Sequence, residues 1–312
     1  MCATHPLAAI ALAAALSSPA PAQRSAALPD SVIRRADSVL VAFMAVHHVP
    51  GLSVAIGLDQ HLVWSKPYGL ADLEDSVPVT TSSMFRTASI GKPMTATAVM
   101  QLWEQGKLDL DAPVQRYCRA FPRKRWPVTA RQLLAHRSGI RDKTPEEETN
   151  YRHYDNIEAS LTIFASDSLL DYMTRRIFTS AGMSHTRLDD PREIIHHRVS
   201  GYALDEPGRL RNSIHDDMSN RVPAGGFVST PEDLVRFGIA VLNGRLVADS
   251  SRRLMWQIQK APGDRAAADE GYGLGWALSD WYGVQEVSHG GARRRSVHSC
   301  TCSRQRGSLW RS

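Results

Sequence analysis

FRTASIGKPM, residues 85–94, leads into an apolar segment that continues to Leu102 and Trp103. Met94, Ala98 and Leu102 recur at helical spacing, and other apolar residues fill most of the remaining faces. A helix that is apolar on nearly every side is usually buried in a protein core. The segment is therefore predicted to form a buried helix that begins near the serine of this stretch.

Ser89 and Lys92 lie three positions apart, so a helix that begins at Ser89 places the hydroxyl and the ammonium on one face. A serine hydroxyl is a poor nucleophile until a neighbouring group accepts its proton, and a lysine in a dry site loses its own proton more readily. The S-x-x-K pattern therefore predicts a nucleophile and its base. For the two residues alone, the alternative interpretation is an N-cap serine followed by a solvated lysine.

The composition is that of an ordinary globular protein with one large domain or two. The chain has 312 residues, of which 43% are hydrophobic and 22% are charged. Its net charge is +5, but residues 293–312 contain six arginines and no acidic residue. Subtracting six charges from +5 leaves −1 for residues 1–292. The body of the chain is near neutral, so we expect no nucleic-acid partner.

The N-terminus carries the pattern of an export signal. A short alanine-rich apolar run at residues 7–16 is followed by small residues and a small-x-small site that ends at Ala22. This arrangement predicts a signal peptide at residues 1–22, too short to span a bilayer, and hence a secreted or periplasmic protein without a transmembrane segment. The residues before the run include no lysine or arginine, so the alternative is a disordered leader.

The cysteines and histidines give no sign of a metal site. The four cysteines suggest neither a disulfide framework nor a zinc spacing. The histidine pairs at 47–48 and 196–197 are adjacent, whereas an i, i+4 spacing would place two ligands on one helix face. We therefore predict no metal and no cofactor.

Several other segments have clear secondary-structure patterns. Residues 31–48 predict an amphipathic surface helix, and residues 52–57 and 61–65 predict a β-hairpin. Thr230, followed by Pro231, predicts the N-cap of a helix. Strands are expected at residues 271–278 and 284–288, and amphipathic helices at 157–164 and 169–178.

His136 lies in the segment LLAHRSGI, residues 133–140, just after a basic loop at residues 123–127. A histidine beside a Ser-Gly turn commonly bonds the loop backbone, so we interpret His136 as structural, with a catalytic role as the alternative. The basic loop is interpreted as solvated surface.

Five motifs occur in one order along the chain. They are S-x-x-K at residues 89–92, LLAHRSGI at 133–140, PAGGFVST at 223–230, GYGLGW at 271–276 and HGG at 289–291. In this order the chain resembles the serine β-lactamase-like family, which groups class C β-lactamases, D-alanyl-D-alanine carboxypeptidases and related esterases and peptidases. The stretch LWEQGKLDLD, residues 102–111, is similar to the branch of mitochondrial serine β-lactamase-like proteins and their bacterial relatives.

The resemblance covers about residues 31–291 and implies an α+β fold. An antiparallel sheet would be flanked by helices, with a mostly helical lobe, about residues 105–230, over the active site. Ser89 would attack a carbonyl to form an acyl-enzyme, and Lys92 would help to take its proton. Its partners would be a small-molecule, peptide or ester substrate.

The third motif of the family would correspond to His289, Gly290 and Gly291 at the edge of the sheet, with His289 as a candidate catalytic residue. Its glycines would let a substrate approach the backbone. The backbone N–H groups of Ser89 and Ala292 would form the oxyanion hole.

The chain departs from the family pattern at the second motif, a tyrosine on a loop of the helical lobe. We interpret the segment that normally carries it as deleted near residues 170 and 171, where one helical pattern follows directly on another. Tyr154, in the sequence Tyr-Asp-Asn, has the residue types of the motif. It precedes the predicted helix at 157–164, however, whereas the family order places the motif after that helix. We therefore interpret this match as coincidental, with Tyr154 as a candidate catalytic residue in the alternative.

The second departure is the C-terminus. After the third motif the family has further strands and a closing helix, whereas residues 292–312 are basic and lack apolar alternation. We interpret this segment as a disordered tail that supplies no buried strand and resembles out-of-frame translation, with a genuine basic surface-binding tail as the alternative.

Two functions remain open from the sequence. The first is a serine hydrolase that cleaves amide or ester bonds as a peptidase, esterase or β-lactamase. The second is a non-catalytic relative that binds a ligand or assembles with partners, which the missing tyrosine segment favours.

Overall fold

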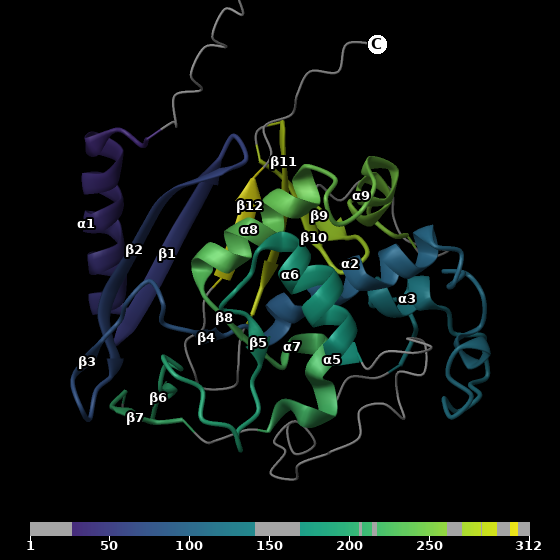
Figure 1. The fold of residues 1–312 in the computed structure, drawn as a ribbon, viewed down its shortest axis with the longest axis horizontal. Coiled ribbons are helices and arrows are strands. Elements are labelled where there is room, and N and C mark those ends of the chain that lie inside the picture. Colours follow the sequence, from purple (N-terminus) through teal and green to yellow (C-terminus); the bar gives the residue numbers. More distant parts are fainter. Residues whose placement is uncertain are drawn as a thin grey trace, which may run out of the picture.

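A computed structural model describes residues 27–140, 169–205, 208–213, 217–260, 270–281, 283–291 and 300–304. The fold combines helices with antiparallel sheets (Figure 1). It is the predicted α+β class. The predicted signal peptide, the predicted helix at 157–164 and Tyr154 lie outside the described residues.

The N-terminal helix α1 (Asp30–Val46) lies along one flank of the molecule beside a hairpin (Figure 1). None of its residues is buried, which agrees with the predicted surface helix. The hairpin consists of β1 (Gly51–Leu58) and β2 (His61–Asp72), which pair antiparallel as the alternation of the sequence predicts, and β3 (Val77–Pro78) extends it.

A second antiparallel sheet is formed late in the chain. Its strands are β9 (Glu270–Tyr272), β10 (Ala277–Trp281), β11 (Val284–Gly290) and β12 (Cys300–Arg304), in the order β12-β11-β10-β9. Helix α8 (Pro231–Leu242) contacts β1 and β2 of the first sheet as well as β12 of the second. Thr230 caps this helix as predicted, because its hydroxyl accepts a hydrogen bond from the Asp233 N–H at 3.2 Å.

The helix predicted from FRTASIGKPM is α2 (Gly91–Glu104), and it runs through the core. Met94, Ala96, Ala98 and Met100 are fully buried, so the helix has neighbours on nearly every side as predicted. It is flanked by α5 (Leu169–Tyr172), which continues through a π-helical segment (Met173–Phe178) into α6 (Thr179–Ala181). The helix predicted at 169–178 is thus confirmed and is extended by three residues.

Shorter elements occupy the region of the predicted helical lobe. Three short strands, β4 (Phe85–Arg86), β8 (Phe227–Ser229) and β5 (Arg187–Leu188), form a sheet in that order. The region from 105 to 230 therefore contains strands as well as helices. The remaining short elements are η2 (Val114–Arg116), α3 (Ala130–Leu134), β6 (Tyr202–Leu204), β7 (Leu210–Asn212), η5 (Met218–Arg221), α7 (Val222–Gly225) and, after α8, α9 (Asp249–Met255).

Two predictions about strands need correction. The single strand expected at 271–278 is two strands, β9 and β10, because Gly275 has φ +79° and the chain turns there. The tail was expected to be disordered, but within it Cys300–Arg304 pairs with β11 as β12. Pairing along a sheet edge uses backbone groups, so it does not require the apolar alternation that the tail lacks.

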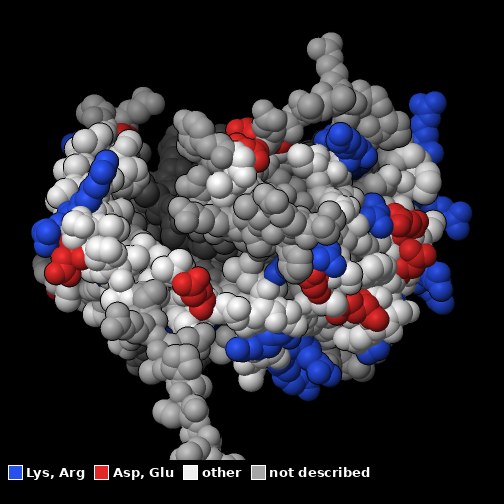
Figure 2. Space-filling view, turned by 90° about the horizontal axis from the view of Figure 1, so that it is seen from above, with Lys and Arg blue, Asp and Glu red and all other residues white. Residues whose placement is uncertain are grey.

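The described surface carries both signs of charge. In Figure 2, acidic and basic side chains are neighbours at several places on the face shown. None of the helices in the described part of the chain combines the length and apolar composition that crossing a membrane requires.

Candidate active site

Ser89 and Lys92 face each other at the start of the buried helix. Ser89 lies in a 3₁₀ turn (η1, Ala88–Ile90) that continues directly into α2, and Lys92 is in the first turn of α2. The Lys92 Nζ donates a hydrogen bond to the Ser89 Oγ at 2.6 Å, and both side chains are half-buried. The alternative of a capping serine and a solvated lysine is not what the structure contains, since the residue at the N-cap of α2 is Ile90 and Lys92 is half-buried against Ser89.

The backbone around Ser89 is held in an unusual conformation by glycine contacts. Ala88 has φ +44°, in the left-handed region that non-glycine residues seldom adopt. A Cβ on Gly225 would lie 1.9 Å from the Ala88 carbonyl oxygen, so only glycine allows α7 to approach so closely. Gly91 packs on the same glycine, because its own Cβ would lie 2.7 Å from the Gly225 Cα. The glycines of two predicted motifs therefore meet behind Ser89.

The third motif reaches the same place from the second sheet. A Cβ on Gly291 would lie 2.3 Å from the Thr87 carbonyl oxygen, which shows how closely the end of β11 approaches the turn that carries Ser89. His289 and Gly290 are the last residues of β11. The structure thus brings Ser89, Lys92 and the HGG motif together, although they are far apart in the sequence.

His289 is part of a row of three rings from three elements. The Tyr272 hydroxyl, on β9, is 2.8 Å from His289 Nε2, and the two ring centroids are 5.8 Å apart. On the other side of Tyr272, the His136 ring lies edge-on at 4.8 Å between centroids. His289 Nδ1 is 2.6 Å from the Gly290 carbonyl oxygen.

Burial and neighbouring charge set the ionisation of this row. Desolvation is the main cause that lowers the pKa of His289. The hydrogen bond to the Gly290 carbonyl opposes it, and the nearby Lys92 and His136 lower the pKa by smaller amounts. Desolvation raises the pKa of Tyr272. Both side chains are therefore neutral at pH 7.

The remaining predicted residues lie outside the described part of the chain. These are Ala292, expected to contribute to the oxyanion hole, and Tyr154. Two residues that the sequence did not assign to the site belong to it, Tyr272 and His136. Both stand in motifs that were recognised, but Tyr272 was interpreted only as part of a strand and His136 only as a loop histidine. Their adjacency to His289 depends on sheet packing that neither motif encodes.

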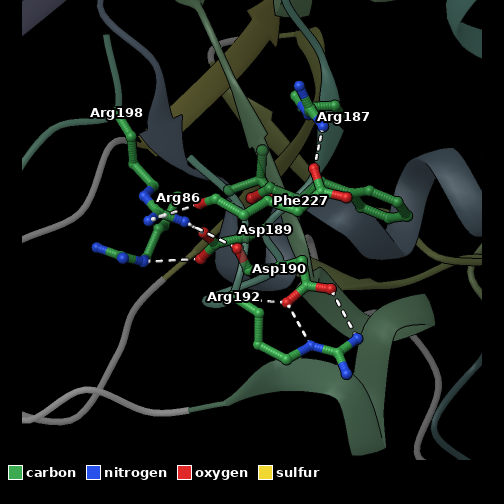
Figure 3. Close-up of polar contacts among 9 residues, drawn as sticks. Arg86, Arg187, Asp189, Asp190, Arg192, Arg198 and Phe227 are labelled. Carbon is green, nitrogen blue, oxygen red and sulfur yellow. Dashed lines mark hydrogen bonds and ion pairs between the residues drawn. The ribbon is translucent and has the colours of Figure 1, made fainter. Parts of the chain in front are cut away.

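A second cluster supports the strand before Ser89. Arg86 on β4 donates a hydrogen bond from Nε to Asp189 Oδ2 at 2.7 Å, and Arg198 Nη1 contacts Asp189 Oδ1 at 3.1 Å (Figure 3). Asp190 pairs with Arg192 in the same region.

A pocket lined by Arg86 lies between β1, β2, β6 and β7. Neither Ser89 nor Lys92 lines this pocket, so it is distinct from the candidate active site.

Ser89 contacts a lysine one helical turn away, at the end of an antiparallel sheet and the start of a buried helix. This arrangement defines a class of S-x-x-K proteins. The Beta-lactamase family model matches residues 36–302. The chain belongs to this family.

Three comparisons illustrate the relationship. The chain is 28% identical over 294 residues to the serine beta-lactamase-like protein LACTB, mitochondrial, of Homo sapiens, covering 62% of this chain and 54% of the relative. It is 29% identical over 294 residues to penicillin-binding protein 4 of Amycolatopsis lactamdurans, covering 80% and 77%. The octameric penicillin-binding protein homologue from Pyrococcus abyssi has the same fold, with a TM-score of 0.68, 24% identity and coverage of 83% and 68%. The chain spans about half the length of the human relative.

Proposed function

We propose that the protein is a serine hydrolase that cleaves amide or ester bonds through an acyl-enzyme on Ser89. The observation that carries the proposal is the 2.6 Å contact between Lys92 Nζ and Ser89 Oγ. A hydroxyl acts as a nucleophile when a base is within hydrogen-bond reach, and the Lys92 amine in its neutral form is such a base.

The reaction has two steps that use the same pair. In the first, the Ser89 oxygen attacks the substrate carbonyl, its proton passes to Lys92, and the amine or alcohol leaves with that proton, so Lys92 is neutral again. In the second, water attacks the acyl-enzyme, the carboxylic acid leaves, and Ser89 regains its proton. Atoms and protons balance over the cycle, and no cofactor is required.

The expected place of the third motif at a sheet edge needs a correction, because β11 lies between β12 and β10. The end of β11, past its last pairing with β10 at Ser288, is proposed to hold the substrate beside Ser89. Gly290 and Gly291 lack side chains that would obstruct an extended substrate, and Gly291 already lies against the turn before Ser89. The backbone N–H groups of Ser89 and Ala292 are proposed to bind the oxyanion. The substrate class is a small molecule, a peptide or an ester, and the name of the Amycolatopsis relative supports penicillin as a first probe.

The test is covalent labelling. The purified chain without residues 1–22 is incubated with a fluorescent phosphonate or a fluorescent penicillin, and the labelled residue is found by mass spectrometry. Labelling at Ser89 that is lost in Ser89→Ala and kept in Ser65→Ala, a serine of β2 outside the site, supports the proposal. A folded, soluble sample that shows no labelling contradicts it and leaves the non-catalytic, ligand-binding alternative.

The predicted signal peptide adds a proposal about location. We propose that residues 1–22 direct export, so that the reaction takes place outside the cytoplasm. The mitochondrial name of the human relative points to another destination for that protein. Expression of the full chain in a bacterium, followed by fractionation and N-terminal sequencing, tests the proposal: a mature chain that begins after Ala22 supports it, and an intact cytoplasmic chain contradicts it.

A further inference from the structure

The row formed by His136, Tyr272 and His289 reaches the candidate active site but has no part in the two steps described above. Its rings come from the loop after α3, from β9 and from β11. Tyr272 lies between the two histidines, in ring contact with both and in hydrogen-bond contact with His289. Tyr272 is therefore a direct neighbour of His289 through both its ring and its hydroxyl.

The contacts of His289 define which nitrogen carries its proton. Nδ1 is 2.6 Å from the Gly290 carbonyl oxygen, and a carbonyl oxygen can only accept, so Nδ1 carries the hydrogen. In the neutral ring, Nε2 is then an acceptor, and the hydroxyl that faces it at 2.8 Å belongs to Tyr272. Tyr272 therefore donates to His289.

We propose that Tyr272 is a positioning residue that fixes His289 as the neutral tautomer with its proton on Nδ1 and, through His289, fixes the Gly290–Gly291 segment against Ser89. The effect on the reaction of Ser89 rests on the proposed hydrolase function. The assignment of the His289 tautomer is independent of that function, because it follows from hydrogen bonds within this chain.

The charges that face His289 agree with a neutral ring. Burial is the main cause that disfavours a positive charge on the ring; the Gly290 carbonyl opposes it, and Lys92 and His136 add smaller contributions against the charge. Tyr272 is an uncharged neighbour because burial raises the pKa of its hydroxyl. Both nitrogens of His289 are occupied, one by the Gly290 carbonyl and one by the Tyr272 hydroxyl. His289 consequently has no free nitrogen for the Ser89 proton, which leaves that proton to Lys92.

The end of β11 depends on this arrangement. The hydrogen bond from Nδ1 ends on the carbonyl of Gly290, the residue next to the glycine that packs on Thr87. A ring that rotates or changes tautomer loses that bond. The backbone on which the substrate is proposed to lie then loses one of its restraints.

The first measurement is the protonation of His289, read by long-range ¹H–¹⁵N NMR of protein labelled at its histidine nitrogens. The His289 signals are assigned with His289→Gln. At pH 7.5 the expected result is a protonated Nδ1 and an unprotonated Nε2 in the full chain, and a loss of that fixed tautomer in Tyr272→Phe. A proton on Nε2 of the unmodified protein, or an imidazolium, overturns the proposal. The tautomer of the unmodified protein is read without an active enzyme, and it decides the proposal even if Tyr272→Phe does not fold.

The second measurement is the rate at which a fluorescent phosphonate labels Ser89. Tyr272→Phe keeps the ring that packs on His136 and removes only the hydroxyl. We expect a fall of about tenfold, the effect of losing one hydrogen bond in the site. Tyr202→Phe is the matched control, because it removes a buried tyrosine hydroxyl that accepts from the Leu73 N–H away from Ser89, and its rate should stay within about twofold.

The outcomes separate the two proposals. If the unmodified protein is not labelled at all, the hydrolase proposal fails while the NMR result still decides the role of Tyr272. If the unmodified protein is labelled and Tyr272→Phe reacts at the same rate, Tyr272 does not position the site. If Tyr202→Phe slows labelling as much as Tyr272→Phe, the effect is one of general stability and the proposal is contradicted.

Discussion

Asp189 binds Arg86 three residues before Ser89 in the sequence, through a contact of 2.7 Å between Asp189 Oδ2 and Arg86 Nε (Figure 3). Asp189 is buried and also pairs with Arg198. The strand that leads to Ser89 is thus attached by an ion pair to the segment that follows β5. The candidate active site depends on contacts well outside the residues that would perform the chemistry.

Removing the Asp189 carboxylate should destabilise the fold strongly. Asp189→Ala leaves two arginines near a buried site without their anion, and breaking a buried ion pair at one partner costs about 3 kcal/mol or more. Asp111→Ala is the control, because the Asp111 side chain is 63% exposed although it also pairs with an arginine. Its cost should stay below about 1 kcal/mol. Urea unfolding of the two variants measures the loss of unfolding free energy in each. Equal losses would show that the buried Asp189 pairs stabilise the fold no more than the exposed Asp111 pair does.

Replacing Lys92 should reduce the labelling of Ser89 by phosphonates by at least about 100-fold, the usual contribution of a general base. Lys92→Met keeps the length and apolar stem of the side chain while removing the amine. The rate is measured by in-gel fluorescence against time, with circular dichroism as the check on folding. A folded Lys92→Met protein that is labelled at the normal rate would exclude Lys92 as the base.

Gly225→Ala should disturb both stability and the site. The added Cβ would lie 1.9 Å from the Ala88 carbonyl oxygen, so the turn that carries Ser89 has to move, at a cost of about 3 kcal/mol. Gly106→Ala is a suitable comparison, because Gly106 also has a positive φ, +67°, but nothing lies within 4 Å of its Cβ position. We expect only about 1 kcal/mol there, from backbone strain. Thermal unfolding and Ser89 labelling of both variants test this, and similar losses would contradict the close-contact explanation.

The pH dependence of stability should contain a contribution from His289. Its pKa is lowered in the folded protein, chiefly by burial, whereas in the unfolded chain it returns to about 6.5. Below that pH the unfolded chain binds a proton that the folded protein resists, so stability falls as the pH drops from about 6.5 toward the lowered value. Above pH 7 both states are neutral and the contribution is constant.

Urea unfolding between pH 5 and 8 measures this dependence. In His289→Gln, the loss of stability at acid pH that comes from this ring should disappear. His61→Gln, at the exposed start of β2, should show the same loss of stability as the unmodified chain. A His289→Gln protein with the same slope below pH 6.5 as the unmodified chain would show that His289 titrates normally.

Much of the fold could be predicted because the relevant patterns are local. The buried helix after residues 85–94, the hairpin and the Thr230 cap each depend on side-chain spacing or on bonds between near neighbours. The S-x-x-K pair is of the same kind, since one helical turn brings Lys92 to Ser89. The strand at 300–304 was missed because sheet pairing is made by backbone groups, which are the same for every sequence.

The sequence by itself therefore determined the buried helix, the serine with its lysine, and the family to which the motifs point. Only the tertiary structure decided that His289 and Tyr272 meet beside Ser89, and that His136 packs on the same tyrosine. These side chains stand on separate elements, and the approach of Tyr272 to His289 follows from the register of the sheet, in which Ala277 of β10 pairs with both Tyr272 and Ser288. Such approaches are set by the packing of whole elements, so no local pattern in the chain specifies them.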